Sequence, residues 1–441
     1  MNLSRIKRWI LLGHRWLGIG TCLLFFLWFL SGVVMMYVGH PKLTWQERLE
    51  HLPPLEASQP LLSPADAFQQ ADIQGTVTDL RLANARAGQP VYIAQVRPDS
   101  KPAPGAPRPD PRLVALDART GALLPPTDPA TALASAQVYL EQGGLSPTSS
   151  SSTLPASGPR QPSPASVQDT PGKPLYQGVT VEDAHTHSAA MDLHRPLHKV
   201  LLPDAEQTLL YISGTTGEVV RDAPRLERGF NYLGAWLHWL YLFRDTAIDW
   251  TELIIWLSII GIVSVISGFL SGIIRWRFSR PYRSGSRSPF APGALRWHHI
   301  LGLVFALTTC TWIFSGLMSM NPWDIFDADD SIIDARRISS PDIQPSHATA
   351  TPQALLARTT TPVRELQWHT LLGKTRVKAT RTHEVPPESA DQPILLSART
   401  GKPYTLEPER LRSALFTLQP GYPPRIDILR QDDFYYYSRA E

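Results

Sequence analysis

Two histidine signatures stand at the edges of apolar runs in this 441-residue sequence: GHRWLGIG at residues 13–20 and RWHHILGL at residues 296–303. Each joins an imidazole to a nearby Leu-Gly pair, so His14 and His298 occupy matching positions. Neutral imidazole is a common metal ligand, and a polar side chain at membrane depth indicates function. We therefore take His14 and His298 as candidate metal ligands. His299 points about 100° away around a helix and is an alternative to His298.

The match between the two signatures extends over a whole apolar segment. A shift of 284 residues (298 − 14) superposes three further pairs: Leu17-Gly18 on Leu301-Gly302, Trp28 on Trp312, and Ser31-Gly32 on Ser315-Gly316. The elements that position both histidines are therefore two copies of one helix. We expect the copies to run parallel and to hold the two imidazoles at the same depth.

Three runs are free of Asp, Glu, Lys and Arg: residues 16–41, 253–274 and 297–323. A helix of about 20 apolar residues crosses the hydrocarbon core of a membrane, so the runs predict spanning helices at 9–38, 250–275 and 296–320. Buried core helices are the alternative, but they rarely stay uncharged for so long. The first run exceeds the apolar core of a signal peptide, about 7–15 residues, and predicts a retained anchor.

Basic residues near the ends of the spans predict the orientation. The N-terminus, residues 1–8, and the loop 276–295 carry Lys and Arg without acidic residues, which is typical of the cytoplasmic side. Residues 39–229 and 321–441 are then periplasmic, in a multi-pass protein of the bacterial inner membrane. We interpret the basic loop as a topology signal and not as a nucleic-acid site, and membrane lipid as the partner of the spans.

The exported regions repeat a smaller plan. Thr-Gly turns occur in ALDARTGALL (115–124), YISGTTGEVV (211–220) and LLSARTGKPY (395–404), and an N-capped helix is predicted before each, at 63–71, 128–140 and 351–359. The pattern predicts helix-then-hairpin modules of α+β type, in each of which a second short strand follows the turn. Pro/Ser-rich stretches at 100–111 and 145–174 predict flexible linkers. The aromatic segment 230–249 predicts one interfacial helix that contains His238.

The repeated helices suit one cofactor in particular. A b-type haem in a membrane needs two axial ligands on facing helices at one depth, as expected for His14 and His298. Arg15 and Arg296 are candidate partners of the haem propionates. The alternative is that the histidines and arginines only anchor the helices at the interface. The histidine pair predicts one b-type haem.

Several of these segments resemble a known family. HRWLGIG…SGVVMMY (14–37), LHWLYLFRDT…WLSIIGIVSVISGFLSGIIRW (237–276) and RWHHILGLVFAL…SG (296–316) resemble the PepSY-associated transmembrane family, and the Thr-Gly modules resemble PepSY domains. The resemblance implies a reductase of ferric siderophores that holds b-type haem, although other members have no settled activity.

Longer family members continue past a region like RQDDFYYYSR (430–439) into another exported module and a fourth spanning helix with a further histidine. The present sequence stops at Glu441, which predicts a truncated gene product, a fragment or a shorter variant and leaves a second haem open. In the family, the position of His238 belongs to the motif before the second span. The resemblance therefore makes His238 a candidate ligand of a second, outer haem, with His40 as a substitute partner, so one or two haems are expected.

Missing motifs narrow the function. HExxH, GxSxG, Walker and GxGxxG motifs do not occur, which disfavours a hydrolase, a kinase or a self-contained NAD or flavin reductase. The donor of electrons is then separate, a quinol or a flavoprotein. The two cysteines, Cys22 and Cys310, lie in apolar runs and are interpreted as packing residues, so no disulfide is expected in the exported regions.

Three functions follow from these observations. The first is haem-b electron transfer that reduces a ferric siderophore or another periplasmic Fe(III) chelate. The second is a non-enzymatic PepSY sensor that binds peptides or proteases. The third is metal uptake through the histidine-rich segment 182–199, which holds His185, His187, His194 and His198; a solvated loop is the alternative there. A homodimer could supply missing ligands.

Overall fold

The computed structural model describes residues 3–99, 110–143, 172–244, 246, 248–326, 343, 345, 349–359, 361–381, 394–418 and 425–427. The chain forms two compact units. The membrane unit comprises Met1–His40 and Gly229–Asp330, and the sheet unit comprises Pro41–Arg228 and Ser331–Glu441. The predicted linkers 100–111 and 145–174 lie almost entirely outside the described residues, and the region 430–439 lies outside them altogether.

The membrane unit is built on three long helices, α1 (Leu3–Tyr37), α6 (Trp250–Arg275) and α7 (Ala294–Ser319). Each is long and apolar enough to cross a membrane, as predicted. Helix α1 begins six residues before the predicted span (9 − 3), because the basic N-terminal residues continue the helix. Large apolar side chains such as Leu23 and Leu307 are exposed on these helices, as expected for surfaces that contact lipid.

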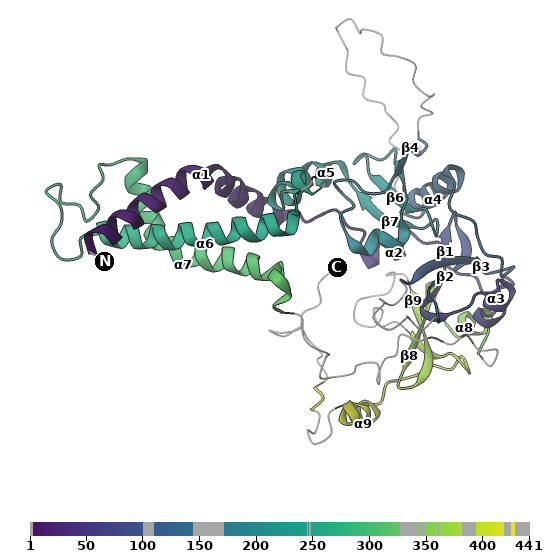
Figure 1. Cartoon of the computed structure of the whole chain (residues 1–441). Helices are drawn as coiled ribbons and strands as arrows, with labels where there is room; N and C mark the ends of the chain where they lie inside the picture. Colours follow the sequence, from purple (N-terminus) through teal and green to yellow (C-terminus); the bar gives the residue numbers. More distant parts are fainter. Residues whose placement is uncertain are drawn as a thin grey trace, which may run out of the picture. The chain divides into compact units, whose positions relative to one another are not determined.

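Helix α6 packs against both α1 and α7 (Figure 1). Small residues on α6 permit this: a Cβ added at Gly261 would lie 3.1 Å from the Phe25 ring of α1, and one added at Gly272 would lie 2.7 Å from Leu303 of α7. These glycines therefore let α6 approach both neighbouring helices closely. Helices α1 and α7 run parallel, because they meet through His14 and His298 near one end and through Phe29 and Trp312 near the other.

The predicted interfacial helix at 230–249 is wrong as a single element. The segment consists of α5 (Arg225–Asn231), a π-helical turn η2 (Tyr232–Trp236) and a 3₁₀ turn η3 (Tyr241–Phe243). A π turn inserts an extra residue, and here it brings Gly234 against α1, where an added Cβ would lie 3.1 Å from Met35. The regular helix ends at Leu240, whose φ of 53° is left-handed. After α7, a short turn η4 (Pro322–Asp324) follows.

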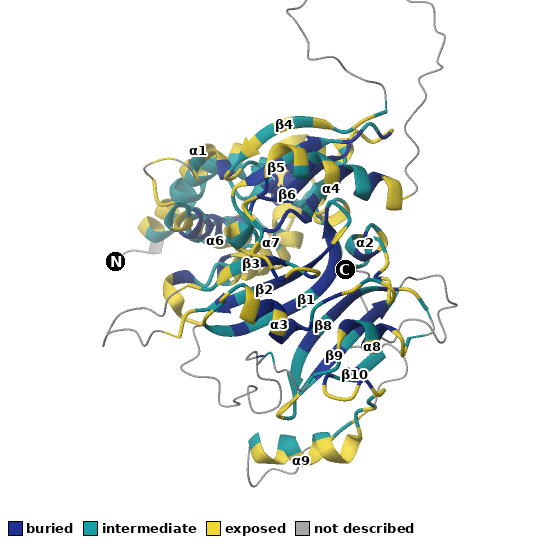
Figure 2. Ribbon diagram, turned by 90° about the vertical axis from the view of Figure 1, so that its right-hand side faces the viewer, coloured by how far each residue is buried: buried dark blue, intermediate teal, exposed yellow. Residues whose placement is uncertain are grey.

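The sheet unit holds two antiparallel sheets (Figure 2). The larger has the order β10-β9-β8-β1-β2-β3. Its strands are β1 (Thr76–Arg86), β2 (Gln89–Arg97), β3 (Arg112–Asp117), β8 (Val363–Leu371), β9 (Lys374–Arg381) and β10 (Ile394–Ser397). The first and third predicted modules are thus joined in one sheet, since β1 pairs with β8 and Leu80 lies opposite Trp368. Both side chains belong to one apolar core.

The smaller sheet has the order β4-β5-β6-β7 and is covered by helix α4 (Pro129–Gln142). Its strands are β4 (Leu175–Thr180), β5 (Leu197–Leu201), β6 (Leu209–Ser213) and β7 (Val219–Ala223), with a 3₁₀ helix η1 (Ala189–His194) before β5. The remaining helices of the unit are α2 (Trp45–Glu50), α3 (Pro64–Gln70), α8 (Pro352–Leu356) and α9 (Pro408–Leu418).

The predicted turns and caps are present. Gly121, Gly217 and Gly401 have positive φ at the three Thr-Gly turns, as tight turns require. The side chains of Ser63, Asp128 and Thr351 cap α3, α4 and α8. Only the second turn leads into a full strand, β7, whereas the other two lead to single bridges, Leu116 to Leu123 and Leu396 to Pro403. The predicted second strand is therefore wrong for those two modules.

Buried ion pairs tie the two sheets together. Arg81 of β1 lies 2.5 Å from Glu218 in the turn between β6 and β7 and 3.7 Å from Glu365 of β8. Arg48 of α2 lies 2.8 Å from the same Glu365. Burial acts to raise the pKa of Glu218, but the attraction of Arg81 outweighs burial and lowers the pKa to about 2. Glu218 therefore stays ionised, and its ion pair with Arg81 holds the two sheets together.

Candidate functional site

His14 and His298 face each other across α1 and α7. Their ring centroids are 6.2 Å apart and their planes differ by 19°. Two imidazoles that share one iron have centroids about 6 Å apart, because each metal–nitrogen bond is about 2 Å and a ring nitrogen lies about 1 Å from its centroid. The two histidines that the repeat singles out are therefore spaced as a pair of axial ligands would be.

A main-chain carbonyl orients the first imidazole. Nδ1 of His14 lies 3.2 Å from the carbonyl oxygen of Ser264 on α6, and the Ser267 hydroxyl is 3.5 Å away. A carbonyl only accepts, so Nδ1 carries the proton and Nε2 keeps its lone pair. Histidines that bind metals typically use this arrangement. Gly268 permits the approach, since an added Cβ would lie 2.7 Å from Cε1 of His14.

Two glycines near the facing imidazoles border open space. Gly18 and Gly302 stand four residues after His14 and His298, on the same helix faces. Among the described residues, no neighbouring atom lies within 4 Å of a Cβ added at either glycine. Any larger residue would project from the same face as the ligand one turn away. The two glycines therefore leave room for a flat ligand next to the imidazole pair.

His299 does not join this pair. It is 7% exposed, its Nδ1 lies 2.8 Å from the Ser288 hydroxyl, and its Nε2 lies 3.0 Å from the carbonyl of Gly272. Both ring nitrogens thus have partners, and the residue ties the loop before α7 to the end of α6. Arg15 is exposed and Arg296 is partly buried. Within the described chain, neither arginine pairs with a carboxylate, so their contact with propionates remains a prediction.

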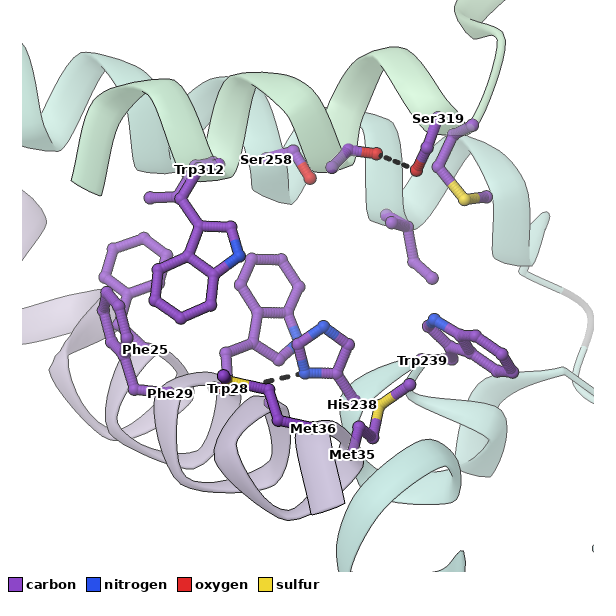
Figure 3. A pocket seen from close by; sticks show the side chains of 15 residues that line it. Phe25, Trp28, Phe29, Met35, Met36, His238, Trp239, Ser258, Trp312 and Ser319 are labelled. Carbon is purple, nitrogen blue, oxygen red and sulfur yellow. Dashed lines mark hydrogen bonds between the residues drawn. The ribbon is translucent and has the colours of Figure 1, made fainter. Parts of the chain in front are cut away.

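A second histidine site lies towards the opposite end of the three helices. A cavity of about 340 Å³ is bounded by α1, α6, α7 and the segment around His238, with aromatic walls that include Phe25, Trp28 and Trp312. Figure 3 shows the ring of His238 directed into this cavity beside Trp28. The lining, as far as the described residues show, does not include His40.

His238 repeats the anchoring seen at His14. Its Nδ1 lies 3.2 Å from the carbonyl of Trp28 and 3.1 Å from the hydroxyl of Ser31. The hydroxyl is itself 2.7 Å from the carbonyl of Leu27, to which it donates. Nδ1 therefore donates to the Trp28 carbonyl, and Nε2 keeps its lone pair. The indole Nε1 of Trp28 is buried without a hydrogen-bond partner in the described structure.

The histidine-rich segment 182–199 does not form a cluster. His187 contacts Glu182, His194 lies 3.1 Å from the Ser213 hydroxyl, and His198 lies 2.9 Å from the Tyr176 hydroxyl. His185 and His198 are 6% and 5% exposed, so a solvated loop is the wrong interpretation for these two residues. Across the described residues, no group of three or more His, Cys, Asp or Glu side chains is placed to hold a metal ion.

Sequence reasoning missed the residues that support the ligands. Ser264 and Gly268 lie among other small residues of α6, but nothing in the sequence of α6 indicates which α1 side chain they contact. The sequence shows Trp28 only as a tryptophan repeated at Trp312, and does not indicate that its indole lacks a hydrogen-bond partner. Comparison of the sequence with models of protein families and with curated proteins finds no match.

Proposed function

We propose that this chain is a haem-b electron-transfer protein of the bacterial inner membrane that reduces Fe(III) in a siderophore or another periplasmic chelate. The facing imidazoles of His14 and His298 carry the proposal, because their spacing and the anchored tautomer of His14 fit a bis-histidine iron site. We also propose membership of the PepSY-associated transmembrane family, on the segments that resemble it. The N-terminus is cytoplasmic in this proposal.

The residues divide the work of holding the cofactor. His14 and His298 would hold the iron through their imidazoles, the Ser264 carbonyl fixes the His14 tautomer, and Gly18 and Gly302 would leave room for the macrocycle. Bound haem supplies a one-electron Fe(III)/Fe(II) couple. Reduction mobilises the metal because hard oxygen chelators hold Fe(II) more weakly than Fe(III).

The His238 cavity offers a second position on the way outwards. Trp28 lies 14 residues beyond His14 on α1, which corresponds to about 21 Å along the helix axis at 1.5 Å per residue. A redox group held by His238 would shorten the path across the membrane. The proposed donor of electrons is a separate quinol or flavoprotein on the side of His14.

The test is the visible spectrum of the purified full chain, oxidised and then reduced with dithionite. We expect a Soret band and sharp reduced α and β bands, both lost in His14→Ala and in His298→Ala. His299→Gln is the matched control, because it changes the adjacent histidine, whose ring nitrogens are already occupied. It should keep the bands, although with a lower yield of folded protein.

The outcomes separate the candidate functions. A haem content near two per chain that falls to one in His238→Ala would add the outer site. Bands that survive both alanine variants, or that vanish only in His299→Gln, would contradict the assigned pair. A protein without bands after expression with ample haem would overturn the reductase proposal in favour of a sensor that binds peptides or proteases.

A further inference from the structure

Strand β9 presents a row of cations on one face of the larger sheet. Val377 and Ala379 point into the apolar core, so Lys374, Arg376 and Lys378 lie on the opposite face, because strand residues alternate. Successive members of the row are about 7 Å apart along the strand. Figure 2 shows β9 between β8 and β10 in the sheet.

Arg376 is the unusual member of this row. It is 7% exposed, and its guanidinium carbon lies 3.7 Å from the centre of the Tyr404 ring. Its Nε is buried without a hydrogen-bond partner. Within the described residues, no carboxylate lies within salt-bridge distance of Arg376, whereas buried Arg81 contacts both Glu218 and Glu365. A buried guanidinium without an anion is unfavourable, so this position suits the binding of an anion.

A cavity adjoins this guanidinium. It has a volume of about 360 Å³ and is lined by β9, by Tyr404 and by α9. Two charged residues of α9 in the lining are already paired, Arg410 with Glu407 at 2.8 Å and Glu409 with Arg412 at 3.9 Å. Lys374 and Arg376 therefore give the cavity its net positive charge. The Tyr404 ring fixes the plane of the guanidinium, which suits bidentate binding of a carboxylate.

We propose that this cavity binds a small ligand with several carboxylates, and that the ligand is the anionic Fe(III) chelate on which the protein acts. Arg376 would hold one carboxylate through its guanidinium fork, and Lys374 would attract a second. The identification of the ligand as an iron chelate rests on the proposed function. The anion site itself rests on Arg376, Lys374 and the cavity.

The test measures binding of gallium citrate to the full chain in detergent by equilibrium dialysis. Gallium(III) resembles iron(III) but is not reduced, so binding is scored whether or not haem is present. We expect Arg376→Gln to weaken binding at least tenfold and Lys374→Gln to weaken it about threefold. Arg119→Gln removes the same charge at an exposed position just after β3, at the opposite edge of the sheet, and should leave binding unchanged.

Three results would overturn the anion site. The first is a wild-type chain that does not bind gallium citrate, and the second is an equal loss in Arg119→Gln. The third is an Arg376→Gln variant that binds normally but unfolds at a lower temperature, which would make the arginine purely structural. Equal affinity for citrate alone would overturn the assignment to a chelate. A neutral gallium trihydroxamate should not bind, and its binding would contradict recognition by charge.

Discussion

At the scale of single residues, the membrane unit treats two histidines alike. Nδ1 of His14 donates a hydrogen bond to the carbonyl of Ser264, and Nδ1 of His238 donates one to the carbonyl of Trp28. In both residues the lone pair of Nε2 remains able to bind another group. His299 has hydrogen-bond partners at both nitrogens. The distinction between ligand candidates and a structural histidine therefore follows from hydrogen bonds, which adjacent positions in a sequence do not reveal.

Gly18 provides a test that leaves both ligands in place. A leucine at this position would project from the face of α1 that carries His14, into the space that we assign to the macrocycle. We expect Gly18→Leu to lower the haem content of the purified protein at least tenfold. The measurement is the pyridine haemochrome spectrum per milligram of protein.

Gly20→Leu is the matched control for this experiment. The space around Gly20 is also open, but the residue lies six positions after His14, on another face of the helix. Normal haem content in Gly20→Leu together with loss in Gly18→Leu would place the cofactor beside Gly18. Equal haem content in the two variants would remove the structural role that we give to this glycine.

At the scale of elements, the predictions from the sequence agree with the structure for features that depend on neighbouring residues. The three spans follow from uncharged runs, and the caps of α3, α4 and α8 follow from Ser63, Asp128 and Thr351 at positions that precede proline. Such features depend only on residues within a turn or two. The pairing of His14 with His298 was predictable as well, because the repeat places them at equivalent positions.

Long-range pairing was not predictable in the same way. The pairing of β1 with β8 brings together residues nearly three hundred positions apart. No residue pattern in either strand indicates that it pairs with the other. The break at Leu240 depends on how Gly234 and its neighbours pack on α1. Packing against a distant element overrode a continuous aromatic pattern that was typical of one helix.

The smaller sheet makes a prediction about pH. Burial raises the pKa of Asp222 on β7 to about 7, and the negative charge of Glu47 adds to this effect. A carboxyl whose pKa is higher in the folded chain than in the unfolded chain costs stability as the pH rises from about 4 to 7. We expect Asp222→Asn to stabilise the protein by on the order of 2 kcal/mol at pH 8, and by much less at pH 5.

Thermal unfolding in detergent, followed by tryptophan fluorescence at pH 5 and pH 8, measures this effect as variant minus wild type. Tyr139 lies 3.4 Å from the Asp222 carboxylate and can donate equally to an asparagine. Asp110→Asn removes a carboxylate at an exposed position and is the control, which should leave the thermal stability nearly unchanged. A stabilisation by Asp222→Asn that is the same at both pH values would contradict a buried titrating carboxyl.

At the scale of the whole molecule, the proposal requires that electrons cross a membrane in one direction, so the orientation of the chain matters. The basic residues around α1 and in the loop 276–295 predict that this side is cytoplasmic. The sheet unit, with its cation-lined cavity, then faces the periplasm. A reversed chain would bring the cavity to cytoplasmic chelates, and the proposed physiological direction of electron transfer would fail.

Cysteine labelling in intact bacterial cells decides the orientation. In a chain with Cys22→Ala and Cys310→Ala, single cysteines are introduced as Ser58→Cys in the sheet unit or Ser284→Cys in the basic loop, both at exposed positions. A maleimide that cannot cross the membrane should label the Ser58→Cys variant at once, and the Ser284→Cys variant only after the cells are opened. The reverse pattern would show that Lys and Arg do not set the topology of this chain. Because α6 is the long apolar helix that lies between Ser58 and Ser284 in the chain, labelling of both in intact cells would instead mean that α6 does not span the membrane.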